Sequence, residues 1–234
     1  MAGRITRKEL KTDKFAVEVE HTVDFVSEHR RQLILYGSIA IVLVASSVGL
    51  YFFMGYQQTV RARALSDAIE IQQAPVGPPN PNALMTFPTE EAKRAAETKA
   101  FGELAAKYPG SGEGAVAKYY LGSIASDQGK MADAEKLFRE AAATGDRNYA
   151  SMARFSLAQV YLAEKRQPDA ETILRDLMAH PTLFVSKEQA TIELARSIAA
   201  TKPAEAKKLL DPLRAQTGPV SQAAMAAAPD ASSE

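Results

Sequence analysis

The stretch LGSIASDQGKMADAEKLFREAA, at residues 121–142, sets a pattern that returns twice further along the chain. The second copy is LAQVYLAEKRQPDAETILRDL at residues 157–177, and the third is LARSIAATKPAEAKKLLDPL at residues 194–213. A fixed period of this length is typical of a repeat architecture, in which each copy forms one packing unit. Three positions keep an interval of 36 residues through all three copies: Ala134, Ala170 and Ala206; Phe138, Leu174 and Leu210; Ala141, Leu177 and Leu213.

Each copy has the apolar spacing of two helices joined by a short turn. Phe101 and Leu104 fit the second helix of an earlier, incomplete unit that ends at Pro109. Small residues stand where neighbouring helices would have to cross at short distance, and larger apolar residues fill the space between them. The small positions are Gly122, Ala134, Ala158, Ala170, Ala195 and Ala206.

These residues resemble tetratricopeptide repeats, which pair a large and a small residue in the first helix. In the second helix that family carries an alanine and an aromatic or aliphatic residue. The usual first-helix tryptophan is absent, and the third copy lacks one residue in its turn, so the repeats are degenerate. The resemblance implies an all-α fold, in which an α-solenoid of three to four tetratricopeptide-like repeats occupies residues 90–216 after one N-terminal transmembrane helix.

Upstream of the repeats, residues 33–56 form an uncharged stretch, LILYGSIAIVLVASSVGLYFFMGY. As a helix it would reach about 36 Å, which exceeds the roughly 30 Å of a bilayer's hydrocarbon core. Tyr36 near one end and Tyr51, Phe52, Phe53 and Tyr56 at the other resemble an interfacial aromatic belt. A cleavable signal peptide is the alternative, but its apolar region is only about 7–15 residues long. We therefore expect an uncleaved transmembrane helix that contacts the lipid bilayer through residues 33–56.

Basic residues are concentrated before this helix, which predicts a cytoplasmic N-terminus by the positive-inside rule. In a bacterium with two membranes the C-terminal part would then lie in the periplasm. The basic residues before the helix are Arg4, Arg7, Lys8, Lys11, Lys14, Arg30 and Arg31, and those that follow it before Lys93 are Arg61 and Arg63.

The remaining segments complete the domain organisation. Residues 1–32 are expected to form a cytoplasmic segment, and residues 57–89 a helix followed by a proline-rich, extended linker. Thr89 is a candidate N-cap, because Glu90 and Glu91 follow it. The stretch from residue 217 to residue 234 is short and rich in small residues, and it is expected to be disordered.

The composition of the chain disfavours a catalytic site. The chain has 28 basic and 28 acidic side chains among 234 residues, and this zero net charge disfavours nucleic-acid binding. It has no cysteine, which excludes disulfides, thiol catalysis and zinc-thiolate sites. Its three histidines lie far apart in sequence. We expect no catalytic site, no metal and no cofactor, and hence a protein that is not an enzyme.

The order of segments resembles the YfgM-like family of single-pass inner-membrane repeat proteins. The most specific part is TVDFVSEHRRQLILYG…YQQTVRARALSDAIEI, within residues 22–71. The resemblance implies an ancillary subunit of the Sec translocon with links to periplasmic chaperones or client chains, located in the bacterial inner membrane. The proline-rich connector and the basic extension at residues 1–14 depart from that pattern. Self-association remains open.

The resemblance to the repeat family also implies where a partner would bind, namely a groove lined by the first helices of the repeats. Two readings share this groove: an adaptor beside the translocon, and a structural organiser that coordinates cell-wall and outer-membrane work. For each groove residue the alternative is that it contacts only the next helix or the C-terminal tail. The groove candidates are Tyr119, Ser123, Asp127, Phe155, Gln159 and Arg196.

Overall fold

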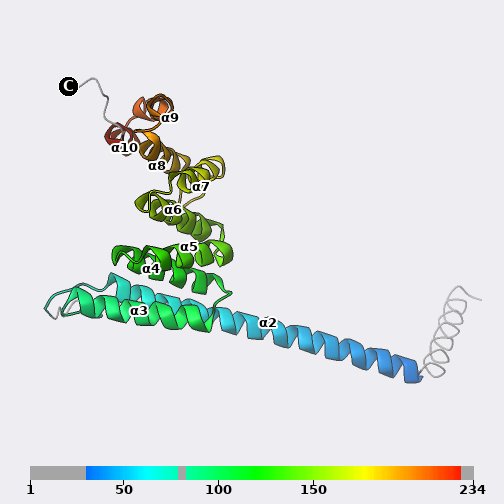
Figure 1. Ribbon diagram of the computed structural model, residues 1–234. Helices are drawn as coiled ribbons and strands as arrows, with labels where there is room; N and C mark the ends of the chain where they lie inside the picture. The colour runs from blue at the N-terminus through cyan, green and yellow to red at the C-terminus, as the bar shows by residue number, and fades with distance from the viewer. Residues whose placement is uncertain (1–29, 79–82, 228–234) are drawn as a thin grey trace, which may run out of the picture. The chain divides into compact units, whose positions relative to one another are not determined.

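The computed structural model describes residues 30–78 and 83–227, and it divides the chain into two units at residues 59 and 60. The described residues form α-helices and one isolated β-bridge, which confirms the all-α prediction (Figure 1). The cytoplasmic segment that we expected at residues 1–32 lies outside the described residues, apart from Arg30, Arg31 and Gln32. These three are the first residues of α2 (Arg30–Gln73).

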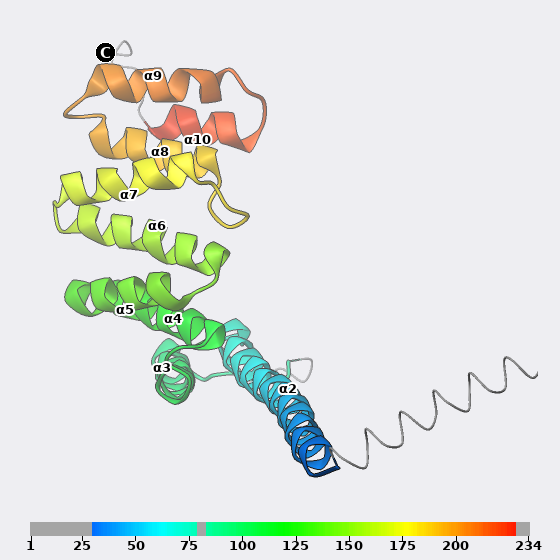
Figure 2. The same ribbon diagram turned by 90° about the vertical axis from the view of Figure 1, so that its right-hand side faces the viewer.

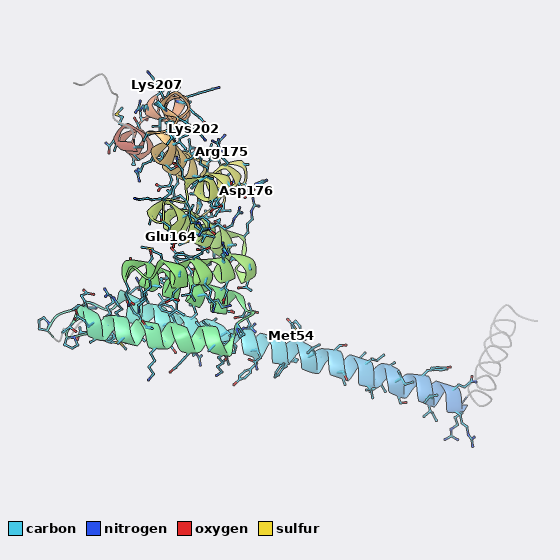
Figure 3. All side chains as sticks on the ribbon, viewed as in Figure 1. Met54, Glu164, Arg175, Asp176, Lys202 and Lys207 are labelled. Atoms are coloured by element: carbon cyan, nitrogen blue, oxygen red, sulfur yellow. The ribbon has the colours of Figure 1, made fainter. Side chains whose placement is uncertain are left out.

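The first unit is described through the N-terminal part of α2, a helix of 44 residues. It is long and apolar enough to cross a membrane, and none of its apolar window is buried within protein. Met54, for example, projects away from the helix with 62% of its surface exposed (Figure 3). The hydroxyls of Ser38 and Ser47 donate to the carbonyls of Leu35 and Leu43, each at 2.8 Å. The helix thus satisfies these polar groups internally, as a hydrocarbon environment requires.

The second unit begins with the end of α2. Ala64, Leu65 and Ala68 pack in one cluster with Phe101 and Leu104 of α3 (Glu90–Lys107). Phe101 and Leu104 occupy the second-helix positions of the earlier unit, which we had predicted to be incomplete. Residues 60–73 of α2 therefore supply its first helix.

The proline-rich segment that follows α2 differs from the expected extended connector. The backbone N–H of Gly77 donates to the carbonyl of Phe87 at 2.9 Å, and that of Phe87 donates to the carbonyl of Pro75 at 3.0 Å. These bonds close the segment into a loop, with an isolated bridge between Val76 and Phe87. Proline lacks only the donor, so the carbonyl of Pro75 still accepts a bond. Gly77, with φ of +148°, adopts a conformation that other residues rarely reach.

The repeats then follow as pairs of helices stacked in chain order (Figure 2). The second helices carry the predicted apolar positions, because Phe101, Phe138, Leu174 and Leu210 are each at most 2% exposed. The pairs are α4 (Gly112–Asp127) with α5 (Met131–Thr144), α6 (Arg147–Ala163) with α7 (Gln167–Ala179), and α8 (Lys187–Ile198) with α9 (Pro203–Arg214).

Capping explains where the helices begin. Thr89, the predicted N-cap, accepts a hydrogen bond from the backbone N–H of Ala92 at 3.2 Å. The side chains of Ser111, Asp146 and Ser186 cap α4, α6 and α8 in the same way. The second helices begin differently, after a basic N-cap residue whose side chain makes no capping bond: Lys130 before α5, Arg166 before α7 and Lys202 before α9.

The turn inside each of the first two repeats passes through left-handed backbone at equivalent positions, 36 residues apart. Gly129 has φ of +72° and Lys165 has φ of +62°. A left-handed residue is uncommon outside glycine, so the glycine relieves strain that the lysine retains.

The C-terminal stretch differs from its prediction. We expected disorder from residue 217, but α10 (Pro219–Ala227) packs against α8 and α9. Ala224 and Ala227 are buried, and the hydroxyl of Ser221 donates to the carbonyl of Arg214 at 3.0 Å. A terminal repeat needs a cap over its open face, and small residues allow a short helix to approach closely enough to provide one. Residues 228–234 of the predicted tail lie outside the described residues.

Packing in the first complete repeat predicts that the effect of Gly122→Ala on stability depends on the side chain at position 138. A Cβ added at Gly122 would lie 2.8 Å from Cε1 of Phe138, whereas the other repeats pair an alanine, Ala158 or Ala195, with a leucine. Gly122→Ala should therefore lower the free energy of unfolding by about 1–3 kcal/mol through overpacking. In a Phe138→Leu background the same change should be neutral or stabilising, because the clash is gone and alanine favours the helix. Urea denaturation of the four variants measures this coupling, and equal effects in both backgrounds would contradict it.

Candidate partner-binding face and inter-repeat contacts

The aromatic groove candidates are partly incorporated in the core. Tyr119 of α4 is half-buried, with its ring centroid 5.6 Å from that of Tyr120 and 5.8 Å from that of Phe138. Phe155 of α6 is also half-buried and packs against the same core cluster as Tyr119. The structure thus brings these two candidates to one cluster on successive first helices. Both side chains are partly exposed.

The polar candidates are more open. Asp127, Gln159 and Arg196 are exposed, on α4, α6 and α8 in turn. Arg196 forms an ion pair with Glu193 of its own helix at 3.1 Å. Ser123 is half-buried, and its hydroxyl donates to the backbone carbonyl of Tyr119 at 3.3 Å. The structure shows where these residues lie, and their role in binding remains a prediction.

Sequence reasoning missed an aromatic contribution from the loop between α7 and α8. Phe184 of this loop meets Tyr149 of α6 edge-on, with ring centroids 5.2 Å apart. Burial is the main cause that raises the pKa of Tyr149, and the negative charge of Asp146 raises it further. Neither residue falls at a periodic position, so the repeat spacing carried no signal for them.

The same loop presents Leu183 to solvent with 84% of its surface exposed. The loop is held in place because the hydroxyls of Ser151 and Thr182 lie 2.6 Å apart. The amide oxygen of Asn148 accepts the N–H of Leu183 at 3.3 Å, and Val185 is 1% exposed. An exposed leucine on an ordered loop extends the apolar surface that a partner could contact.

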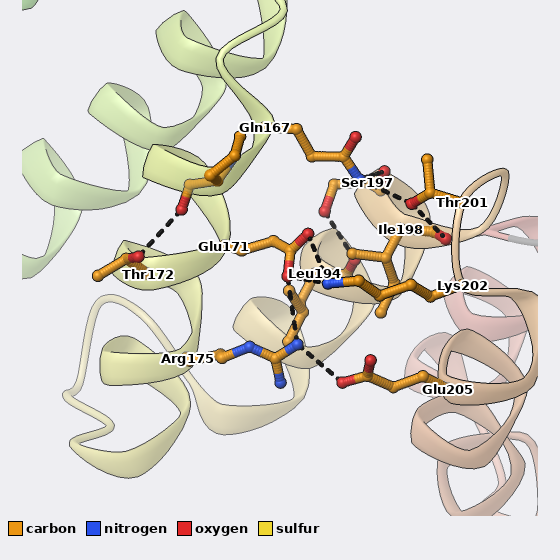
Figure 4. Close-up of polar contacts among 11 residues, drawn as sticks. Gln167, Glu171, Thr172, Arg175, Leu194, Ser197, Ile198, Thr201, Lys202 and Glu205 are labelled. Atoms are coloured by element: carbon orange, nitrogen blue, oxygen red, sulfur yellow. Dashed lines mark hydrogen bonds and ion pairs between the residues drawn. The ribbon is translucent and has the colours of Figure 1, made fainter.

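Charged side chains join successive repeats on the second helices. Nζ of Lys202 donates to Glu171 at 2.8 Å, and Arg175 bonds both Glu171, at 3.3 Å, and Glu205, at 2.7 Å (Figure 4). One repeat earlier, Arg166 pairs with Glu135 at 2.8 Å and with Asp169 at 3.0 Å. We call these two groups of contacts the inter-repeat ladder, and each group is one rung of it. The charged residues of the two rungs recur at 36-residue spacing: Glu135 and Glu171, Arg139 and Arg175, Arg166 and Lys202, Asp169 and Glu205.

The ring and hydroxyl of Tyr161 strengthen the rung that contains Arg166 and Glu135. The guanidinium of Arg166 lies 4.0 Å from the ring centroid of Tyr161, and Nη2 of Arg139 donates to the Tyr161 hydroxyl at 2.7 Å. Desolvation lowers the pKa of Arg166, but its hydrogen bonds to Asp169, Glu135 and Glu164 outweigh that effect and raise the pKa, so the guanidinium stays charged. The ladder therefore has a structural role, which accounts for these charged residues without a catalytic function.

The ladder predicts acid sensitivity. The hydrogen bond from Lys202 is the main cause that lowers the pKa of Glu171, and the hydrogen bond from Arg175 lowers it further. A lowered folded pKa contributes stability above the usual glutamate pKa, and this contribution is lost as the pH falls through the folded value. Glu171→Gln should therefore reduce stability at pH 7 and flatten the acid side of the profile. Glu103→Gln, at an exposed position on α3, is the control. Parallel profiles for Glu171→Gln and the native chain would contradict the prediction.

Within residues 30–78 and 83–227, no group of three histidine, cysteine, aspartate or glutamate side chains lies close enough to hold a metal ion. The features that this part of the chain offers are a row of first helices with partly exposed aromatic and polar residues, and a ladder of ion pairs. This arrangement defines a helical-repeat protein of the tetratricopeptide type, a class whose members bind other proteins.

Comparison with known families agrees. The tetratricopeptide repeat-like domain family matches residues 32–188, which is more than half of the chain, so the chain belongs to this family. The matched range begins in α2 and ends in the first residues of α8. No curated protein and no solved structure matches the chain.

Proposed function

We propose that this chain is a membrane-anchored adaptor that binds proteins and does not catalyse a reaction. The observation that carries the proposal is that the family match starts at residue 32, inside α2, and continues through the first two complete repeats to residue 188. That one family match covers both the apolar helix and repeats supports a tethered repeat domain. A tether keeps the repeats at high effective concentration near membrane partners, so that each contact can be weak.

The proposed location is the bacterial inner membrane, with the N-terminus in the cytoplasm and the repeats in the periplasm. Support comes from the excess of Lys and Arg before the apolar stretch. The YfgM-like resemblance makes the Sec translocon and its clients or chaperones the proposed partners.

The absence of cysteine makes the orientation straightforward to test. A single cysteine at Lys208, exposed on α9, should react with a membrane-impermeant maleimide once the outer membrane is permeabilised. A single cysteine at Thr6 should react only after the inner membrane is broken. Labelling in the opposite order would contradict the proposed orientation.

The adaptor proposal is tested by placing a photo-crosslinking amino acid at Gln159 or at Arg196, both exposed on first helices. Lys208, on a second helix, is the matched control position. In native membranes we expect crosslinks to translocon subunits or exported clients from the two first-helix positions and few from the control. Crosslinks to cell-wall or outer-membrane assembly proteins would support the envelope-organiser reading instead.

A further inference from the structure

A pocket of about 520 Å³ opens between α3, α4 and α5, within the second unit. Its apolar lining includes Leu121 and Ile124 of α4 and Leu137 of α5. Charged side chains also line it: Lys118, Lys130, Asp133, Lys136 and Glu140. The size falls within the range of about 300–1,000 Å³ that is usual for ligand pockets.

The inter-repeat ladder explains why this pocket is open. Lys130 is the basic N-cap of α5, and it is the counterpart of Arg166 and Lys202, 36 and 72 residues further on. Arg166 and Lys202 are each bonded to a glutamate of the preceding second helix, Glu135 and Glu171. Lys130 should meet the corresponding residue of α3.

That residue of α3 is not an acid. Aligning Phe101 with Phe138 places Thr98 where the ladder has Glu135, and Gly102 where it has Arg139. Thr98 is exposed and lines the pocket together with Lys130. A Cβ added at Gly102 would meet nothing within 4 Å. The first rung of the ladder is therefore missing both of the side chains that α3 would have to supply.

The charges in the pocket reflect the missing rung. Nζ of Lys118 pairs with Glu140 at 3.1 Å and also donates to the carbonyl of Pro109 at 3.1 Å. Lys130 and Lys136 have no ion pair with any residue of the described ranges 30–78 and 83–227. Among the residues that line the pocket, Asp133 is the acid that remains for these two ammonium groups, and it is the counterpart of Asp169 and Glu205. The pocket is short by one carboxylate.

We propose that this pocket binds a protein segment in which an aspartate or glutamate is flanked by large apolar side chains. The partner's carboxylate takes the place of the missing glutamate beside Lys130, and its apolar neighbours cover Leu121, Ile124 and Leu137. A side chain is the fitting occupant because a side chain fills this place at the next two rungs. The inference rests on the proposed function only in that the occupant is a protein.

The pocket is separate from the groove candidates. At about 100° per residue, Leu121 and Ala125 lie on roughly the opposite side of α4 from Tyr119 and Ser123. A partner could therefore occupy the groove and the pocket at the same time, or two partners could bind independently.

The test uses the full chain in detergent and two fluorescein-labelled nonapeptides, identical except for a central glutamate or glutamine between leucines. Fluorescence polarisation should show the glutamate peptide binding about tenfold more tightly, which is the discrimination expected of a charge-assisted hydrogen bond. Equal affinities, or no binding of either peptide, would overturn the proposal. Displacement of the glutamate peptide by dodecanoate at lower concentration than by unlabelled peptide would also overturn it, in favour of a lipid.

Two variants address the site itself. Lys130→Gln should abolish the preference for glutamate, and Thr98→Glu should weaken binding of the glutamate peptide at least about tenfold by completing the rung. Lys187→Gln and Thr172→Glu, at exposed positions of α8 and α7, are the matched controls and should bind as the native chain does. Unchanged binding by Thr98→Glu would overturn the pocket proposal. Crosslinking from Gln159 and Arg196 tests the adaptor function separately, so either idea can fail alone.

Discussion

Leu174→Ala is expected to lower the free energy of unfolding of the repeat domain by about 2–5 kcal/mol. Leu174 is completely buried, at the second-helix position that Phe138 and Leu210 occupy in the neighbouring repeats. Its loss removes apolar burial and leaves a cavity that the surrounding helices can fill only in part. Because each repeat is stabilised by its neighbours, a defect at the middle repeat should weaken the interfaces on both sides.

The matched control is Leu183→Ala, which removes the same side chain from a loop position that is 84% exposed. That variant should stay within about 0.5 kcal/mol of the native chain. Urea denaturation of the full chain in detergent, followed by tyrosine fluorescence and circular dichroism, measures both. A loss at Leu174 no larger than the loss at Leu183 would contradict the assignment of the repeat core.

The second large effect concerns α2. Val44→Arg combined with Val48→Arg should release the chain from the membrane, because each arginine at the centre of a spanning helix costs about 2.5–3.5 kcal/mol on insertion scales. Both valines are exposed in the structure, so the substitutions disrupt no packing in the described chain. Gln58→Arg, beyond the apolar stretch, is the control.

Sedimentation after carbonate extraction measures this effect. The native chain and Gln58→Arg should remain in the pellet, and the double arginine variant should move to the supernatant or be degraded. Retention of the double variant in the pellet would show that α2 is not the anchor.

The repeat core could be predicted from the sequence because its signal is periodic. Ala134, Ala170 and Ala206 are each at most 1% exposed, at the positions that the 36-residue interval indicates. The same interval relates the charged residues of the ladder, Glu135 with Glu171 and Arg166 with Lys202, but spacing alone does not indicate which charges are in contact. Only the structure shows that these charges meet across repeats.

Other features had no periodic signal. The alanine-rich stretch that forms α10 has a composition equally typical of disorder, and it is ordered by the open face of the last repeat. The contacts of Pro75 and Gly77 with Phe87 are backbone hydrogen bonds, which no side-chain pattern predicts. The pocket beside Lys130 could not be predicted either. Its missing side chains are recognised only when Thr98 and Gly102 are compared with Glu135 and Arg139, whose contacts the structure shows.

The most direct test of the account is recovery of the full chain from its native membrane in mild detergent, with mass spectrometry of the proteins that accompany it. A parallel recovery uses residues 57–234, which lack the anchor. A third recovery uses residues 1–59 alone. The account predicts translocon channel subunits with the full chain, their loss without residues 1–56, and client chains or chaperones that accompany the full chain but not residues 1–59. If the full chain brings down no protein beyond those recovered with residues 1–59 alone, the repeats bind no stable partner and the adaptor function is contradicted.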